Sequence, residues 1–357
     1  MVLHNRINKE ILKQQLHESQ EERITLSFYR YLNLTDVQSY RDQLYADLYE
    51  LGVMGRIYVA QEGINAQTSV PKSNFNDFKA YINSSETLNG VRLNIAVEEN
   101  GKSFFKLKIQ IRKKIVADGL NDQTFDVTKR GTHVSAAEFN ELANDPNTVI
   151  VDMRNHYESE VGHFRNALLP DVDTFRESLP IVEAMLSGSK DKNIVMYCTG
   201  GIRCEKASAY YKHRGFEKVF QLDGGIIEYA RQVNEKGLEN KFTGKNFVFD
   251  ERLGERISEE IVSQCHQCGK PADSHTNCKN DGCHLLFIQC DECAAKYEGC
   301  CTTECQEVIH LPEEEQRLLR AKKNLGRQVF KKGRSKNLIY KSNRVKPVDY
   351  SSADVEK

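Results

Sequence analysis

The sequence predicts a multidomain protein that combines α/β and α+β architecture and carries a cysteine-rich module after them. Its 357 residues, 39% hydrophobic and 28% charged, are enough for two or three domains with separate cores. Strand and helix periods alternate as far as about residue 235, and nine of the 11 cysteines lie between Cys265 and Cys305. We therefore expect domains at residues 1–115, 135–240 and 241–310, a connector at 116–134, and a basic, flexible tail at 311–357.

The first domain is predicted to follow the order β-α-β-β-α-β. Apolar alternation marks the strands, the spacing of Leu44, Leu48 and Leu51 marks the first helix, and Pro71 opens the second helix. The expected elements are strand 24–32, helix 37–51, strands 55–60 and 64–70, helix 71–82 and strand 91–97. This order is that of the split βαβ unit in ferredoxin-like α+β folds.

A basic stripe ends the first domain. In residues 104–111, apolar side chains such as Leu107 and Ile109 alternate with polar ones. The candidate RNA-binding residues of this stripe are Lys106, Lys108, Arg112 and Lys113. Two interpretations stay open: an edge strand that carries lysine against aggregation, or a surface that follows the phosphates of a nucleic acid.

The central domain is predicted to be an α/β domain with a parallel sheet. A helix at 135–144 begins after Ser135, a good N-cap residue, and strands and helices alternate from there. The apolar run at 194–197 is typical of a buried strand, and it delivers Cys198 to the edge of the sheet.

The loop after Cys198 is the strongest functional signal in the chain. Its glycine pair lets several peptide N–H groups point inward. Together with Arg203 and the positive end of the following helix, these groups would stabilise a thiolate, a persulfide or a bound oxyanion. The candidate catalytic residues are Cys198 and Arg203, and the other loop residues are Thr199, Gly200, Gly201 and Ile202. A buried structural cysteine is the alternative, and Cys204 is either a second, resolving thiol or a core residue of the helix.

The six residues from Cys198 to Arg203 resemble the active loop of the rhodanese superfamily, whose first position is the sulfur-carrying nucleophile. The motifs D-x-R-x-x-x-E and G-H-x-x-x-A of that superfamily are matched by Asp152, Arg154, Glu158, Gly162, His163 and Ala167. The resemblance implies a rhodanese-like central domain that ends near the glycine pair Gly224 and Gly225. We expect Asp152, Arg154 and Glu158 to form a charged scaffold around the loop, and a catalytic role for them is the alternative.

Two C-x-x-C pairs separated by a loop predict a zinc site, because that spacing lets the thiolates meet one tetrahedral ion. The first predicted site consists of Cys265, Cys268, Cys290 and Cys293. A second, cross-braced site would use Cys278, Cys283, Cys301 and Cys305, with His275 or His284 as substitutes. An iron–sulfur cluster and reactive free thiols are the alternatives to structural zinc.

Up to about residue 310, the chain resembles the rhodanese-domain tRNA uridine hydroxylases. The segments that carry this resemblance are residues 28–32, 55–67, 198–203, 244–257, 265–268 and 273–284. The resemblance implies oxygen-dependent 5-hydroxylation of the wobble uridine in tRNA, with Cys198 as the active cysteine and tRNA as the partner. A basic stripe and a basic tail would provide separated phosphate contacts, and a flipped base could enter the Cys198 pocket.

The resemblance implies molecular oxygen and an unknown reductant as cosubstrates. We find no G-x-G-x-x-G motif for a nucleotide cofactor and no haem attachment spacing. The nearest pattern to a non-haem iron site is His156, Glu158 and His163, and iron there is an alternative. In one hypothetical route, the Cys198 thiolate adds to C6 of the uracil and makes C5 nucleophilic toward an activated oxygen donor.

Two rival functions stay open. The first is a sulfurtransferase that works through a Cys198 persulfide, and the second is a non-catalytic RNA-binding adaptor. The net charge of −1 suggests no polyanion partner, yet every charged side chain from Arg317 to Lys346 is cationic. Without a signal-peptide h-region or an apolar stretch of membrane-spanning length, the chain is expected to be cytoplasmic and not to bind a membrane. The sequence does not predict the oligomeric state.

Overall fold

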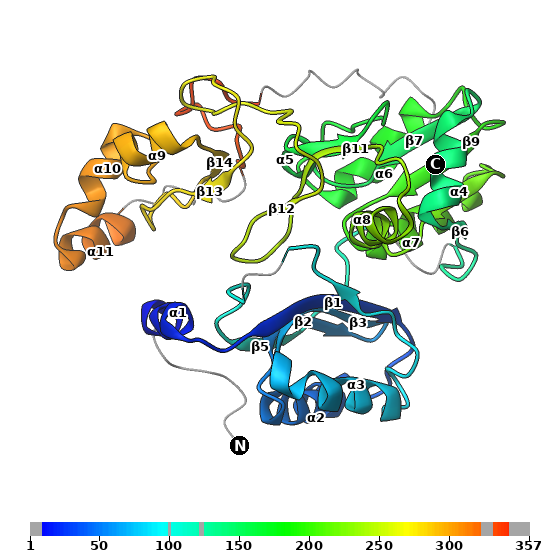
Figure 1. Cartoon of the computed structure of the whole chain (residues 1–357), viewed down its shortest axis with the longest axis horizontal. Coiled ribbons are helices and arrows are strands. Elements are labelled where there is room, and N and C mark those ends of the chain that lie inside the picture. The colour runs from blue at the N-terminus through cyan, green and yellow to red at the C-terminus, as the bar shows by residue number, and fades with distance from the viewer. Residues whose placement is uncertain (1–8, 99–100, 121–124, 323–330, 343–357) are drawn as a thin grey trace.

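The computed structural model describes residues 9–98, 101–120, 125–322 and 331–342. Figure 1 shows an N-terminal sheet layered on two helices, a central α/β domain above this sheet, and a smaller C-terminal module at the side. None of the described helices is long and apolar enough to cross a membrane.

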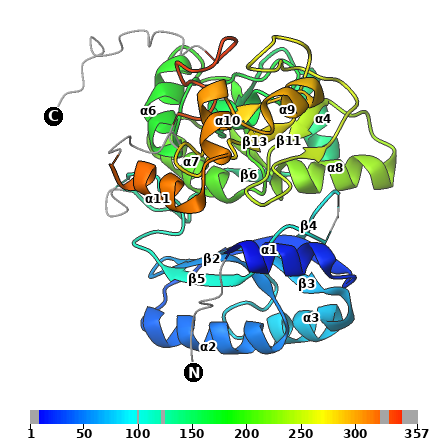
Figure 2. The same ribbon diagram turned by 90° about the vertical axis from the view of Figure 1, so that its left-hand side faces the viewer.

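The N-terminal domain is a five-stranded sheet in the order β4-β1-β3-β2-β5. Its elements are α1 (Lys9–Glu18), β1 (Arg23–Tyr31), α2 (Val37–Glu50), β2 (Met54–Ala60), β3 (Gly63–Pro71), a 3₁₀ turn (Lys72–Asn74), α3 (Phe75–Ser84), β4 (Asn94–Ile95) and β5 (Leu107–Ile111). Helices α2 and α3 cover one face, where strand residues such as Phe28 and Ile57 pack against helix residues such as Leu48 and Phe78. The opposite face is turned toward the central domain, as Figure 2 also shows.

Two predicted boundaries in this domain differ from the structure. The predicted strand 91–97 is reduced to β4, because the Val97 N–H leaves the sheet and donates to Glu255 Oε1 of the C-terminal part at 3.1 Å. Pro71 ends β3, paired with Arg23, and does not open the helix that follows. Helix α1 was not predicted.

The central domain has a four-stranded parallel sheet in the order β6-β10-β9-β7, as expected for an α/β domain. Its elements are β6 (Thr132–Val134), α4 (Ala136–Asn144), β7 (Thr148–Asp152), α5 (His156–Ser159), β8 (Gly162–Phe164), α6 (Phe175–Met185), β9 (Asn193–Tyr197), α7 (Ile202–His213), β10 (Val219–Leu222) and α8 (Gly225–Lys236). Alternate residues of β9 enter two cores: Ile194 and Met196 pack with α6 and α7, whereas Val195 and Tyr197 pack with α4 and α8. Ser135 caps α4 through a capping box with Glu138, which confirms the predicted N-cap.

The C-terminal module is joined to the central domain through β11, which pairs with β8 and with β12. Its elements are β11 (Phe242–Asn246), β12 (Glu255–Arg256), β13 (His275–Asn277), β14 (Leu286–Ile288), α9 (Asp291–Tyr297), α10 (Thr303–Ile309) and α11 (Glu313–Lys322).

The segment 331–342, which belongs to the predicted tail, is packed against this module. The Gly333 N–H donates to Leu286 O at 2.7 Å and the Tyr340 N–H to His266 O at 2.9 Å. The side chain of Leu338 is buried with the second group of cysteines. Residues 323–330 and 343–357 of the predicted tail lie outside the described residues.

Candidate active site

The loop after β9 curls back on itself as its glycine pair predicts. Gly201 has a φ of +97°, and a Cβ atom there would lie 2.8 Å from the Tyr29 hydroxyl oxygen of the N-terminal domain. Gly225, at a φ of +67°, leaves no room for a Cβ atom either, since it would lie 2.5 Å from Cys198 O. Because only glycine adopts these conformations without strain, both positions require it.

Cys198 lies at the centre of this loop as an acidic thiol. Its side chain is 1% exposed, and the Gly201 N–H donates to its Sγ at 3.2 Å. Burial alone would raise the pKa of Cys198. This effect is outweighed by a hydrogen bond from the Cys204 thiol, the charge of Arg203, and the N–H groups of Arg203 and Cys204, which together lower the pKa to about 6. Cys198 is therefore mostly a thiolate at neutral pH.

Cys204 lies in the first turn of α7 and is packed in the core with α6 and β9. Burial raises the pKa of its thiol well above the usual range, and so does the neighbouring Cys198. It therefore stays protonated beside Cys198, whose pKa it lowers. All 11 cysteines are free thiols in this structure.

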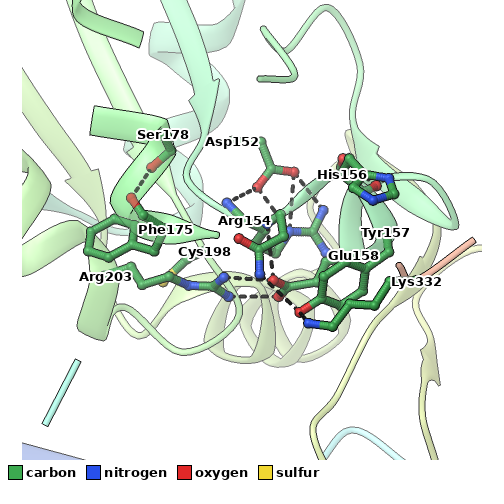
Figure 3. A network of polar contacts seen from close by, with 12 residues as sticks. Asp152, Arg154, His156, Tyr157, Glu158, Phe175, Ser178, Cys198, Arg203 and Lys332 are labelled. Carbon is green, nitrogen blue, oxygen red and sulfur yellow. Dashed lines mark hydrogen bonds and ion pairs between the residues drawn. The ribbon is translucent and has the colours of Figure 1, made fainter. Parts of the chain in front are cut away.

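The charged residues of the rhodanese-like motif form a buried network behind the loop (Figure 3). Glu158 accepts two hydrogen bonds from Arg203, both of 2.7 Å. Arg154 donates to Asp152 and to Gly162 O, and both side chains are fully buried. Asp152, Arg154 and Glu158 do not line the cavity described below, whereas Arg203 does.

One residue of the C-terminal segment, which sequence reasoning did not connect with the site, reaches this network. Lys332 lies over the Tyr157 ring at 3.9 Å and donates to its hydroxyl oxygen at 2.7 Å. Tyr157 is also bound by Asn155, whose N–H donates to Glu158. Lys332 of the segment 331–342 is thus connected, through Tyr157 and Asn155, to the Glu158 carboxylate that binds Arg203.

A cavity of about 390 Å³ lies between the loop and the open face of the N-terminal sheet. This volume is within the range of small-ligand sites, ~300–1,000 Å³. Cys198, Thr199, Gly200 and Arg203 line one side of it. The sheet contributes Ser27, Tyr29, Arg56, Tyr58, Asn65, Gln67 and Asn94, and the C-terminal part contributes Phe249, Arg252 and Glu255.

Most of these cavity residues were not identified as site residues from the sequence. They come from strands far apart in the chain, and only the folded sheet brings them to one face. A signal was present nevertheless, because Ser27 and Tyr29 alternate with buried Leu26 and Phe28 in a strand whose polar face would otherwise be exposed to water.

Hydrogen bonds fix the loop and the following helix against the N-terminal domain. The Tyr29 hydroxyl donates to Glu205 Oε1 at 3.1 Å, and Asn94 Nδ2 donates to Gly200 O at 3.4 Å. Lys206 is fully buried and forms ion pairs with Glu62 at 2.5 Å and with Asp118 at 2.8 Å. The two domains are therefore joined at the active loop itself.

The basic stripe lies on the edge strand β5 and directly beside both of its ends. Arg112 stacks over the Tyr58 ring at 5.3 Å, and Lys108 is exposed. Lys106 lies over the Phe105 ring. Lys113 lines a second cavity of about 600 Å³ between the two domains. This placement agrees with both interpretations of the stripe.

The cysteines of the C-terminal module form two compact groups. Cys265, Cys268, Cys290 and Cys293 make up the first group, and Cys278, Cys283, Cys301 and Cys305 the second. Within each group the sulfur atoms all lie within 4.8 Å of one another. A tetrahedral ion with Zn–S distances of ~2.3 Å holds its sulfurs ~3.8 Å apart. The sulfur distances of 3.6 Å between Cys268 and Cys290 in the first group and 3.7 Å between Cys283 and Cys301 in the second fit such an ion, so both groups could bind a metal.

The alternative ligands from the sequence do not converge in the described residues. Neither His275 nor His284 belongs to either group of cysteines. His156, Glu158 and His163 form no cluster that could hold an ion: His156 pairs with Asp173, Glu158 is occupied by Arg203, and His163 Nδ1 contacts Ser159 O. The iron site considered from the sequence is therefore not formed.

Comparison with known proteins gives matches to every part of the chain described above. The UPF0176 acylphosphatase like domain matches residues 23–115, the Rhodanese-like domain residues 135–232, and the Rhodanase C-terminal family residues 243–306. A protein of Yersinia enterocolitica named tRNA uridine(34) hydroxylase is 57% identical over 95% of this chain and 96% of its own length. A protein of the same name from Yersinia pestis is 56% identical over 99% of both chains.

Proposed function

The chain belongs to the tRNA uridine(34) hydroxylase family, and we propose that it hydroxylates C5 of the wobble uridine in tRNA with molecular oxygen. The observation that carries this proposal is the Cys198 thiolate at one wall of a cavity large enough for a nucleobase. A flipped base must leave the stack to reach an enclosed thiol, and single-stranded anticodon bases can do so at low cost.

Cys198 would act as a nucleophile on the uracil ring. Its sulfur forms a bond to C6, and the C5–C6 π pair moves to C5 as an enolate. C5 then forms a bond to one oxygen atom of molecular oxygen. The second oxygen atom leaves as water, with two electrons and two protons from an external donor such as a thiol reductant. Loss of the C5 proton and breakage of the C6–S bond return Cys198 as a thiolate and release 5-hydroxyuridine.

The surrounding residues prepare this thiolate. The N–H group of Gly201, together with those of Arg203 and Cys204, stabilises the charge before addition and after release. Arg203 is held in place by its two bonds to Glu158, so it keeps a positive charge beside the sulfur. Asp152 and Arg154 would serve as scaffold.

Other parts of the chain have supporting roles in this proposal. The N-terminal layer would be a ferredoxin-like domain, which its strand order β4-β1-β3-β2 supports. Structural zinc would occupy the two groups of cysteines and hold the C-terminal module together. The basic stripe would contact tRNA phosphates, and the protein would act in the cytoplasm. The first two domains would span residues 1–115 and 135–240, and the C-terminal module would begin at residue 241 and include α11 and the segment 331–342.

The test is nucleoside mass spectrometry of bulk tRNA from cells that lack this protein and are grown in air. Wild type should restore 5-hydroxyuridine derivatives, and Cys198→Ala and Cys198→Ser should not. Cys300→Ala is the matched control, because Cys300 is buried but belongs to neither group of cysteines. Persistent hydroxylation in Cys198→Ser would contradict the addition of sulfur to C6.

A sulfurtransferase remains the second candidate, because the same loop would also stabilise a Cys198 persulfide. Transfer of sulfur from thiosulfate to cyanide by the purified protein, with unchanged tRNA in the deletion strain, would favour this candidate. Binding of tRNA without either activity would favour the adaptor.

A further inference from the structure

Three arginines line the cavity, and one of them has no acidic partner. Arg203 donates to Glu158 at 2.7 Å. Arg252 donates to Glu255, also at 2.7 Å. In the described part of the chain, Arg56 forms neither a hydrogen bond nor an ion pair with another residue. Its positive charge is therefore available to a ligand.

Arg56 lies at the mouth of the cavity. The next residue of β2, Ile57, is buried in the core with α2 and α3, so Arg56 is directed to the opposite face of the sheet. Arg56 lines the cavity and is also exposed to solvent. A side chain with both properties lies where the cavity opens to water.

A second cation without an acidic partner, Lys108, lies directly beside Arg56. Strands β2 and β5 are parallel, and in their register Arg56 is paired with Lys108. Leu107 and Ile109 pack in the core, so Lys108 shares the open face with Arg56. Lys108 is exposed and forms no ion pair among the described residues. Like charges on paired residues of neighbouring strands repel one another, and an anion bound between them would remove this repulsion.

Further cations continue from this pair along the edge of the sheet. Arg112 follows β5 and lies over the Tyr58 ring at 5.3 Å, and Lys113 lines the second cavity. Neither forms an ion pair with a carboxylate in the part of the chain that the structure describes. A free anion would need only one pair of cations, whereas a nucleic acid backbone carries a negative charge at every nucleotide. The continuing cations therefore favour RNA as the source of the anion.

We propose that Arg56 and Lys108 bind a phosphate next to the flipped wobble uridine, at the mouth of the cavity. This inference rests on the proposed function, and it assigns to the N-terminal sheet the positioning of the nucleotide that Cys198 attacks. The guanidinium of Arg56 can donate two parallel hydrogen bonds to phosphate oxygens, and the ammonium of Lys108 adds a second positive charge. A base inside the cavity leaves its backbone at the mouth, where this pair of cations lies.

The test is a double-mutant cycle between protein and RNA. In a synthetic anticodon hairpin, an uncharged methylphosphonate replaces the phosphate on the 5′ side or on the 3′ side of the wobble uridine, one at a time. Full-length Cys198→Ser protein is the parent, so that no turnover occurs, and affinity is measured by fluorescence anisotropy at constant ionic strength.

We expect one of the two replacements to weaken binding to the parent about 5- to 12-fold, between the values for an exposed ion pair and for a hydrogen bond to a charged group. Adding Arg56→Gln should cause a loss of similar size with the unmodified hairpin. It should cause no further loss with that methylphosphonate hairpin, because the charge that Arg56 binds is already absent.

Two further variants sharpen the test. Lys108→Gln should show the same coupling to the same phosphate. Lys79→Gln is the matched control, because Lys79 is an exposed lysine in α3, on the far side of the sheet. In this control the methylphosphonate should cost as much affinity as in the parent.

A methylphosphonate loss of the same size in the parent and in Arg56→Gln would overturn the inference, as would the absence of any loss in the parent. Inorganic phosphate tests for a free anion. Competition with the unmodified hairpin that disappears in Arg56→Gln, without coupling to either wobble phosphate, would also overturn the inference.

Hydroxylation of the unmodified hairpin by the protein that retains Cys198 is measured separately. Hydroxylation without coupling between Arg56 and a wobble phosphate refutes the inference alone. Coupling without hydroxylation refutes the proposed function and keeps Arg56 as a ligand of the phosphate.

Discussion

Replacement of Cys204 by alanine should weaken the thiolate character of Cys198. The Cys204 thiol, in the first turn of α7, and the charge of Arg203 both lower the pKa of Cys198. A hydrogen bond to a charged group is worth about 1.5–3 kcal/mol, and one pKa unit corresponds to about 1.4 kcal/mol. Removing this donor should therefore raise the pKa of Cys198 from about 6 to about 7–8. The thiolate fraction at pH 7 would fall from about 90% to between about 10% and 50%.

The assay is the rate of alkylation of Cys198 by iodoacetamide as a function of pH, read by mass spectrometry of the peptide that contains it. The midpoint in wild type should lie near pH 6, and Cys204→Ala should move it upward. Cys204→Ser is the matched control, because its hydroxyl keeps a donor at the same place and should keep most of the shift. A midpoint that is the same in wild type and Cys204→Ala would refute this account of the acidic thiol.

Four further predictions concern the fold and the surface. Glu158→Gln removes the partner of buried Arg203 and should lower the free energy of unfolding in urea by about 3–5 kcal/mol, whereas Glu235→Gln, at an exposed pair with Arg231, should change it by less than about 1 kcal/mol. Metal analysis of purified protein should find two zinc ions per chain, one of which is lost in Cys268→Ser and neither in Cys300→Ser; a metal-free, fully folded protein would contradict this. Burial lowers the pKa of His275 to about 3, so this side chain stays neutral in the folded protein when it takes up a proton in the unfolded chain. Acid therefore favours the unfolded chain, and the urea midpoint of unfolding should fall as the pH drops below about 6.5. The fall should be less steep in His275→Asn. Lys108→Ala and Lys113→Ala should each reduce the slope of the logarithm of tRNA affinity against the logarithm of salt concentration by about one phosphate contact. Lys79→Ala, in helix α3 on the far side of the sheet, should leave this slope unchanged. Equal slopes for all three variants would favour the edge-strand interpretation.

Local sequence patterns were sufficient to predict the features whose structure depends on residues close together in the chain. The active loop is formed by consecutive residues, so the spacing of Cys198, Gly201 and Arg203 already specifies its geometry. The first group of cysteines follows from its two C-x-x-C pairs in the same way, whereas the second group has wider spacings and could be predicted only as the remaining cysteines of the cluster. The N-cap at Ser135 is also a local property and is found as predicted.

Features that depend on distant residues were not predicted. Asn94 and Thr199 are more than a hundred positions apart, and nothing local to either residue shows that they line one cavity. The strand predicted around Asn94 was too long, because a bond from Val97 to Glu255 of another domain ends the pairing with β1. Lys332 was assigned to a flexible tail, since a run of cationic residues carries no sign of the Tyr157 ring that one of them contacts.

The residues that follow Arg203 explain why the catalytic loop and the N-terminal domain act as one site. Glu205 and Lys206 lie in the same helical turn as Arg203, and both are buried under residues of the N-terminal domain. Lys206 brings one positive charge against Glu62 and Asp118, and an unpaired charge at this depth would be costly. Separation of the domains would therefore expose the cavity and leave Lys206 without Glu62, at the same helix that holds Arg203 beside Cys198. A small sulfur donor needs only the loop. A base that must be selected before Cys198 attacks it also needs the cavity wall formed by the N-terminal sheet, and the ion pair between Lys206 and Glu62 keeps this wall in place.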